Sequence, residues 1–246
     1  MLFRSGCIRA LSNFDNGINT EILGLYFVNG YIPAPHTVYK NIFKLRPGCI
    51  LRSGYPYSEE NTDISTYWSV VDTALKGRDN PFKGSFEEAS AELERLLKRS
   101  ISGQMVADVP LGAFLSGGID SAAVVALMQS VNPGKVKSFT IGMEDKAYNE
   151  AVFAKQIAAH LGTEHTELYI NDNDAQKVIP LLPGMFSEPF ADSSQIPTYL
   201  VSRMTGEHVT VSLSGDAGDE LFGGYNLYGA MTNIWKKIRH IPLLVR

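Results

Sequence analysis

The sequence has few cysteines, and no pattern joins them. Cys7 and Cys49 are the two cysteines among 246 residues, and neither belongs to a Cys-x-x-Cys or Cys/His spacing. This argues against a disulfide framework and against a metal site built on cysteine. It favours a reducing compartment.

The chain also lacks a long apolar run and an excess of positive charge. No stretch approaches the roughly 20 consecutive apolar residues of a membrane helix, and the first residues do not fit a signal peptide. A net charge of -4 and a pI of about 5.8 give nothing to attract nucleic acid or an anionic membrane. We therefore expect a cytoplasmic protein that has no nucleic-acid or membrane partner and binds a small anionic ligand.

What the sequence does contain, from Ser85 onward, is a regular alternation of elements. Ser85 is the expected N-cap of a helix that reaches about residue 105. Strand patterns and helix patterns then follow in turn, with strands at 111–115, 136–142, 165–170 and 208–215 and helices at 121–130, 149–162 and 196–206. Such alternation predicts an α/β fold, with a parallel twisted sheet and helices on both faces.

The part before Ser85 is less regular. Residues 18–30 read as a helix, residues 31–54 are interrupted by prolines and glycine, and residues 58–84 read as a polar crossing segment. Fewer than about 60 residues without a disulfide or metal form a marginal domain. We expect this part to pack on something larger.

One glycine-rich loop follows the first strand of the sheet, in the sequence LSGGIDS. Gly117 and Gly118 allow close approach to the backbone, Ser116 and Ser121 add hydroxyls, and Asp120 lies in the first turn of the next helix. Backbone N–H groups and the positive helix end favour a phosphate. The loop is neither a GxxxxGK[ST] nor a GxGxxG motif. An ordinary strand-to-helix turn is the alternative.

A second such loop, SGDAGDE, follows the strand pattern at 208–215. The carboxyl ends of parallel strands are where ligands bind in such sheets, so both loops are expected at one edge. Acidic side chains beside polyphosphate require a hard cation, which makes Asp120 and Asp219 expected Mg²⁺ ligands. Helix N-capping is the alternative for each carboxylate. Two acidic loops at equivalent places favour the metal.

Five segments together resemble one enzyme family. They are VPLGAFLSGGIDS, VKSFTIGM, AHLGTEH, EPFADSSQIPTYLVSR and LSGDAGDELFGGY, and they are similar to the glutamine-dependent asparagine synthetases. NGYIPAPHTVYKNIFKLRPGCIL resembles the end of that family's class II glutamine amidotransferase domain. The resemblance implies a PP-loop ATP pyrophosphatase fold, with residues 1–65 as an amidotransferase remnant of α+β type, 66–84 as linker and 85–246 as the N-terminal part of the synthetase domain.

The resemblance also implies roles for individual residues. Asp120 and Asp219 would hold Mg²⁺, and Asp192, Ser193 and Ser194 would contact the amino-acid substrate. Asp216 stands where the family has Glu, and with Asp219 it is a candidate catalytic residue. The residues implied for ATP binding are Phe114, Leu115, Ser116, Gly117, Gly118, Asp120, Ser121, Ile141, Gly142, Ser214 and Gly215. His160 and His165 are interpreted as structural.

The activity implied is an ATP-dependent amide-forming ligase. The β-carboxylate of aspartate is adenylated, with release of pyrophosphate, and ammonia derived from glutamine displaces AMP. The family's N-terminal cysteine nucleophile has no counterpart, because the second residue is Leu2, so we expect a fragment without glutaminase activity. A nucleotide-binding fragment without turnover and a β-lactam-forming synthetase are the alternatives, and a homodimer is the expected assembly.

Overall fold

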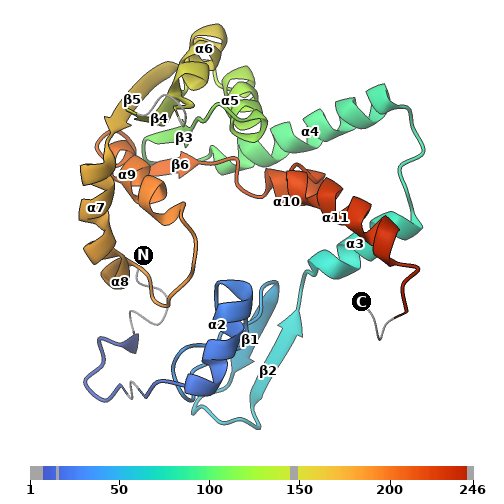
Figure 1. Ribbon diagram of the computed structural model, residues 1–246, viewed down its shortest axis with the longest axis vertical. Helices are drawn as coiled ribbons and strands as arrows, with labels where there is room; N and C mark the ends of the chain where they lie inside the picture. The colour runs from blue at the N-terminus through green and yellow to red at the C-terminus, as the bar shows by residue number, and fades with distance from the viewer. Residues whose placement is uncertain (1–7, 15–16, 145–148, 243–246) are drawn as a thin grey trace. The chain divides into compact units, whose positions relative to one another are not determined.

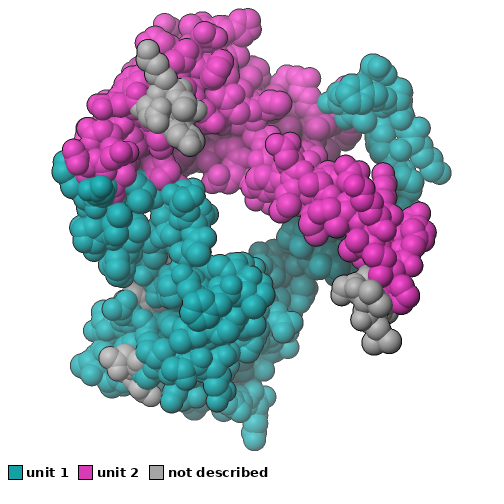
Figure 2. Space-filling model, in the orientation of Figure 1, with its two compact units in different colours: residues 1–90, 176–196 teal, residues 91–175, 197–246 magenta. Residues whose placement is uncertain are grey.

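The computed structural model describes residues 8–14, 17–144 and 149–242, so Leu2 and Cys7 lie outside the described residues. The chain divides into two compact units, drawn in teal and magenta in Figure 2. Unit 1 consists of Met1–Ser90 and Gln176–Ile196, and unit 2 consists of Ala91–Ala175 and Pro197–Arg246. Each unit has a hydrophobic cluster of its own.

Unit 2 contains a parallel sheet, as the alternating sequence pattern predicts. Its strands are β3 (Leu111–Phe114), β4 (Lys137–Met143), β5 (Glu164–Ile170) and β6 (Val211–Leu213), in the order β5-β4-β3-β6 (Figure 1). β3 pairs in parallel with β4 on one side and with β6 on the other. The first and the last strand in sequence are therefore neighbours, and the loops that follow them leave the same edge of the sheet.

Helices cover both faces of this sheet (Figure 1). On one face, Ala113 and Leu115 pack with residues of α5 (Ile119–Val131) and α6 (Ala151–Leu161). On the other face, Phe139 packs with residues of α9 (Gln195–Thr205). Because successive side chains of a strand point to opposite faces, β3 contributes Ala113 to the first cluster and Phe114 to the second. The expected α/β architecture is confirmed.

The helix before the sheet, α4 (Phe86–Gln104), begins at the expected residue. The Ser85 N–H donates to Glu88 Oε2 at 2.8 Å, and the Glu88 N–H donates to Ser85 Oγ at 3.2 Å. This reciprocal pair is a capping box. Ile101 of α4 is 5% exposed and belongs to the same cluster as Ala113 and Leu115.

Unit 1 includes a short antiparallel hairpin and a small cluster. β1 (Cys49–Ser53) pairs with β2 (Thr62–Thr66), and the cluster joins Ile32, Val38 and Tyr39. Cys49 is a free thiol. The remaining elements of the chain are η1 (Thr20–Ile22), α2 (Leu23–Asn29), α3 (Val70–Asp79), α7 (Asp172–Val178), η3 (Ile179–Leu181), α8 (Leu182–Met185), α10 (Gly218–Phe222) and α11 (Asn226–Ile238).

Two expectations about secondary structure are wrong in detail. Residues 58–84 are not simply a polar crossing, because they contain β2 and α3. β2 has the sequence TDIST, with one apolar residue, so its strand is set by pairing with β1 and not by its own pattern. The strand expected at 208–215 is shorter, because the N–H groups of His208 and Val209 donate to the Thr205 carbonyl at the end of α9.

In the described ranges, no helix is long and apolar enough to cross a membrane.

His160 and His165, which are interpreted as structural from the sequence, differ in their surroundings. His160 is exposed in the last turn of α6. The His165 side chain is 9% exposed, its Nδ1 lies 2.9 Å from Ser138 Oγ, and its buried Nε2 has no hydrogen-bond partner. Glu167 Oε1 is 4.0 Å from that Nε2 and 3.0 Å from Lys155 Nζ. Burial lowers the pKa of His165 below its ordinary value of 6.5, although the nearby Glu167 carboxylate acts in the opposite direction.

This lowered pKa predicts an acid-sensitive fold. The unfolded chain protonates this imidazole at a higher pH than the folded protein does, so the free energy of unfolding should decrease as the pH falls through 6.5 toward the folded-state pKa. His165→Gln should flatten that decrease, and His160→Gln, which changes an exposed histidine, should not. Denaturant unfolding at several pH values measures both. Equal slopes for the parent and His165→Gln would contradict the assignment.

Candidate functional site

The loop after β3 is held in shape by its own serines. The Ser116 N–H donates to Ser121 Oγ at 3.0 Å, and the two hydroxyl oxygens lie 2.8 Å apart. The Gly118 N–H donates to Ser116 Oγ at 3.1 Å. Ser121 is 8% exposed, and its hydroxyl makes its hydrogen bonds within the loop. The sequence predicts that both hydroxyls bind phosphate, and in the structure the two hydroxyls are hydrogen-bonded to each other.

The same loop opens directly onto the N-terminus of α5. Gly118 is the N-cap, and no side chain caps the helix. The first intrahelical bond runs from the Ala122 N–H to the Gly118 carbonyl at 3.2 Å. The amides of residues 119–121 precede it and have no intrahelical acceptor. An anion at this end would meet those N–H groups and the positive end of the helix dipole.

The loop after β6 lies against the first loop. A Cβ built on Gly215 would be 2.6 Å from the Ser121 nitrogen and 2.9 Å from the Asp120 carbonyl carbon. A Cβ on Gly218 would collide with the Asp120 carboxylate. Gly215 is therefore required by close contact with backbone, whereas a side chain at Gly218 would displace the Asp120 carboxylate. The two loops, which lie roughly 95 residues apart in the sequence, form one surface within unit 2. This juxtaposition is the one predicted for the ends of adjacent parallel strands.

Carboxylates are concentrated on the second loop. Asp216 accepts a hydrogen bond from Ser214 Oγ at 2.9 Å. Asp219 lies in the first turn of α10, and its carboxylate occupies the space beside Gly224 that a Cβ would fill. Ala217 has φ +74°, a left-handed conformation that disfavours a side chain with Cβ. The loop thus holds a backbone strain of the kind seen at functional sites.

The residues expected to line the adenosine pocket are mostly buried or partly buried. Leu115 is 2% exposed in the core, its N–H donates to the Phe139 carbonyl at 2.8 Å, and its carbonyl accepts from Thr140 Oγ1. Phe114 packs against the cluster on the opposite face. Gly142 is buried between Tyr169 and Ala151. Ile141 is partly buried in β4.

The residues expected to contact the amino-acid substrate belong to unit 1, whereas the two loops belong to unit 2. Asp192, Ser193 and Ser194 are exposed. The Ser194 N–H donates to Asp192 Oδ1 at 2.8 Å, and Gln195 Nε2 donates to the Asp192 carbonyl at 2.8 Å. The three residues therefore form a hydrogen-bonded turn directly before α9.

One pair near the second loop was not found from the sequence. Tyr225 OH donates to Glu220 Oε1 at 3.0 Å, and this hydrogen bond raises the pKa of Tyr225 above its ordinary value. The two residues close the turn between α10 and α11. A spacing of five residues fits neither helical nor strand periodicity. The only sequence signal for this turn is the GGY that ends LSGDAGDELFGGY.

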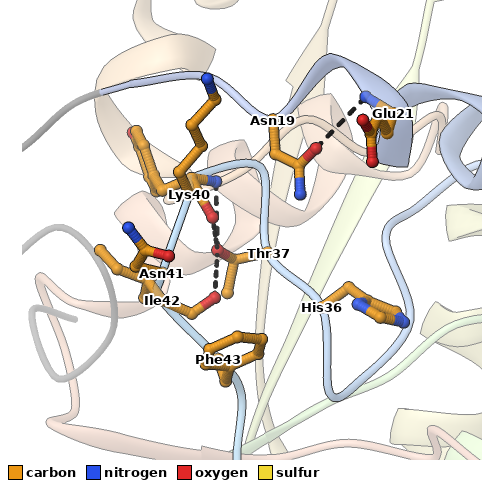
Figure 3. Close-up of a pocket in the computed structure, with 9 residues that line it drawn as sticks. Asn19, Glu21, His36, Thr37, Lys40, Asn41, Ile42 and Phe43 are labelled. Carbon is orange, nitrogen blue, oxygen red and sulfur yellow. Dashed lines mark hydrogen bonds between the residues drawn. The ribbon is translucent and has the colours of Figure 1, made fainter.

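The cavities found in unit 1 are lined by other residues. One, of ≈ 290 Å³, lies around the loop 36–43 and is shown in Figure 3. There the buried Thr37 hydroxyl donates to the Ile42 carbonyl at 2.8 Å and to the Tyr39 carbonyl at 3.1 Å. Another, of ≈ 410 Å³, lies between Val38, Tyr39 and residues 182–195. Neither includes a residue of the two glycine-rich loops.

Taken together, the two loops provide complementary groups at one sheet edge. The first contributes the backbone amides of a helix N-terminus that no side chain caps, and the second contributes carboxylates. Such a pair suits a ligand that has both phosphate and bound cation. In the part of the chain that the structure describes, no three His, Cys, Asp or Glu residues gather to form a metal site from protein ligands alone.

The fold and the site define an α/β protein with a glycine-rich loop between the first strand of a parallel sheet and the N-terminus of α5. The asparagine synthase family model matches residues 92–246. The chain is 37% identical over 241 residues to "Putative asparagine synthetase [glutamine-hydrolyzing] 2" of Methanocaldococcus jannaschii, covering 95% of this chain and 44% of that protein. This chain belongs to the asparagine synthase family.

A second relative is also an asparagine synthetase by name. "Asparagine synthetase [glutamine-hydrolyzing] 1" of Bacillus subtilis is 33% identical over 236 residues, covering 93% of this chain and 34% of that protein. The chain thus spans less than half the length of these two relatives. An NH3-dependent NAD synthetase from Campylobacter jejuni, solved with the nitrate ion, matches 58% of this chain and 62% of its own at 17% identity, with a TM-score of 0.38.

The contact between the loops predicts which glycine tolerates a side chain. In Gly215→Ala, the new methyl group would meet backbone atoms that cannot move aside, so we expect a loss of about 1–3 kcal/mol in the free energy of unfolding. Gly229→Ala is the matched control, because nothing lies within 4 Å of its Cβ position and alanine favours helix. Denaturant unfolding measures both. Equal stability for the two variants would argue against the contact.

Proposed function

We propose that the chain is part of an ATP-dependent ligase that makes asparagine from aspartate, ATP and ammonia. The observation that supports this most is the packing of Gly215 and Gly218 on Asp120 and Ser121, which joins the amide-bearing loop to the carboxylate-bearing loop. Adenylation needs both kinds of group at the same phosphates. Family membership and the names of the relatives agree with this reaction.

In this proposal the first loop binds the leaving group. The amides of residues 119–121 hold the β- and γ-phosphates, while Ser121 keeps Ser116 and the backbone of the loop in place. An oxygen of the aspartate β-carboxylate attacks the α-phosphorus, and the bond from that phosphorus to pyrophosphate breaks. Positioned donors stabilise the charge that develops on pyrophosphate. The residues proposed for the adenosine are Phe114, Leu115, Ile141, Gly142, Ser214 and Gly215.

The second step forms the amide. The nitrogen of ammonia attacks the activated carbonyl carbon, the bond to AMP breaks, and a proton leaves the nitrogen. Asp216 is the proposed acceptor of that proton, although its carboxylate stands where the family has the longer Glu. Asp192, Ser193 and Ser194 are proposed to contact the aspartate substrate. Asp192 and Ser194 are already joined at 2.8 Å, so their turn is preformed.

The two loops also suit a magnesium ion. Mg²⁺ in nucleotide sites takes one or two carboxylates and completes its shell with phosphate oxygens and water, so one carboxylate from each loop suits it. Asp120 and Asp219, one from each loop, are the proposed ligands. The ion would supply charge neutralisation for the pyrophosphate leaving group.

Residues 1–65 are proposed as an amidotransferase remnant, 66–84 as linker and 85–246 as part of the synthetase domain. We also propose a cytoplasmic location and a homodimer. A nucleotide-binding role without turnover is the second candidate, because the uncapped N-terminus of α5 is by itself suited to a phosphate. A β-lactam-forming synthetase would share the ATP loops.

Nucleotide binding tests the role of Asp120. Asp120→Ala should weaken ATP binding strongly in the presence of Mg²⁺ and weakly without it, since it removes a metal ligand and leaves the loop amides. Gly218→Ala should act in the same direction by displacing the Asp120 carboxylate, and Gly229→Ala should bind as the parent does. Calorimetry with and without Mg²⁺ measures this. Parent-like binding by Asp120→Ala in Mg²⁺ would exclude the metal role.

Product analysis tests the reaction itself. With aspartate, ATP and ammonia, the parent should release AMP and pyrophosphate, and Asp219→Asn should lower turnover by about a hundredfold or more, because one charged stabiliser of the leaving group is lost. ATP binding without any product would favour the second candidate. Formation of ADP and phosphate would place the attack at the γ-phosphorus and contradict the mechanism.

A further inference from the structure

A carboxylate outside the two loops ties two distant parts of unit 1 together. Glu188 Oε2 accepts a hydrogen bond from the Val38 N–H at 3.1 Å, and Glu188 Oε1 lies 3.2 Å from Lys44 Nζ. The Glu188 side chain is 14% exposed. Lys44 Nζ also donates to the Ile32 carbonyl at 2.6 Å, so the lysine is itself fixed in place. A half-buried ion pair that also binds backbone is stronger than an exposed surface pair.

A second attachment lies three residues further along. The Ala191 N–H donates to the Gly30 carbonyl at 2.6 Å. Gly30 ends α2 with φ +75°, and a Cβ there would reach Ala191 at 3.7 Å. Phe186 and Phe190 form an edge-to-face pair with ring centroids 4.7 Å apart. Residues 186–191 are therefore held on the part of unit 1 that precedes residue 45.

These attachments come immediately before the turn at residues 192–194. Gln195 Nε2 donates to the Phe190 carbonyl at 2.9 Å and to the Asp192 carbonyl at 2.8 Å, which closes the turn from its other end. The turn is exposed and has no buried side chain of its own. Its conformation therefore depends on its two ends, and Glu188 holds the first of them.

We propose that Glu188 is a positioning residue for aspartate recognition, and that residues 30–44 contribute to this recognition by anchoring it. This inference rests on the proposed function of residues 192–194. A preformed turn binds its ligand without a further ordering cost, whereas a released turn must be ordered by the ligand. Loss of the anchor should thus weaken aspartate binding and leave ATP binding and chemistry unchanged.

Two variants separate the parts of the anchor. Glu188→Gln keeps the size and an oxygen that accepts from the Val38 N–H, but it removes the charge that pairs with Lys44. Glu188→Ala removes both interactions. Lys44→Arg keeps the positive charge and is the conservative variant. Glu60→Gln changes an exposed carboxyl of the same unit and is the matched control.

Pyrophosphate release at varied aspartate concentration is the first measurement. Glu188→Gln should raise the KM for aspartate about tenfold, with kcat and the KM for ATP within about twofold of the parent, and Glu188→Ala should raise it further. Lys44→Arg and Glu60→Gln should behave as the parent does. An unchanged aspartate KM in Glu188→Ala, or an equal loss in kcat and in both KM values, would overturn the positioning role.

Amide hydrogen exchange gives a second measurement that needs no turnover. Glu188→Ala should increase exchange of the Ala191 and Ser194 amides at least tenfold, while the amides of β3 and β4 exchange as in the parent. If the parent releases no pyrophosphate, the proposed function of this chain fails, and L-aspartate is then the probe in exchange. Protection of the 192–194 amides by aspartate in the parent but not in Glu188→Ala would support the inference, and equal exchange in both would overturn it.

Discussion

The candidate site depends on one close backbone contact, between the loop after β6 and the first turn of α5. Gly215 lies so near the backbone of Asp120 and Ser121 that it has no room for a Cβ, and a Cβ at Gly218 would displace the Asp120 carboxylate. This contact exists because β3 and β6 are hydrogen-bonded neighbours and both end at the same edge. It brings the N-terminal turn of α5 and the acidic loop after β6 onto one surface. A wider separation would leave a plain helix terminus and an unrelated acidic turn.

The internal bonding of the first loop changes how its serines are understood. Ser121 is buried and bonded to Ser116, so it supports the loop from within. In the proposed function the phosphates meet backbone amides at a helix start, which are fixed by the fold and not by side-chain rotamers. A site of this kind is preorganised, which is the condition for stabilising a leaving group. The strained Ala217 in the facing loop is consistent with the same requirement.

Unit 1 combines segments that are far apart in the chain. Residues 176–196 belong to it together with the first 90 residues, although the sequence alone suggests a division near residue 85. Glu188 and Ala191 explain why, since both bond to backbone before residue 45. The segment that contains Asp192 thus lies within the N-terminal unit, while α9, which follows it, extends into the core of unit 2. The residues proposed to contact aspartate are therefore held by contacts within unit 1, and the loops proposed to bind the nucleotide are held by contacts within unit 2.

The sequence by itself determined the alternation of strands and helices, the two glycine-rich loops and the family, because hydrophobic period, glycine spacing and acidic residues are local properties of the chain. It did not reveal β2, whose five residues contain one apolar side chain and become a strand only by pairing with β1. Nor did it reveal the Ser116–Ser121 bond, the burial of His165 or the Glu188 anchor. Tertiary structure alone decided these features, because each depends on contacts between residues whose spacing along the chain follows no helix or strand period.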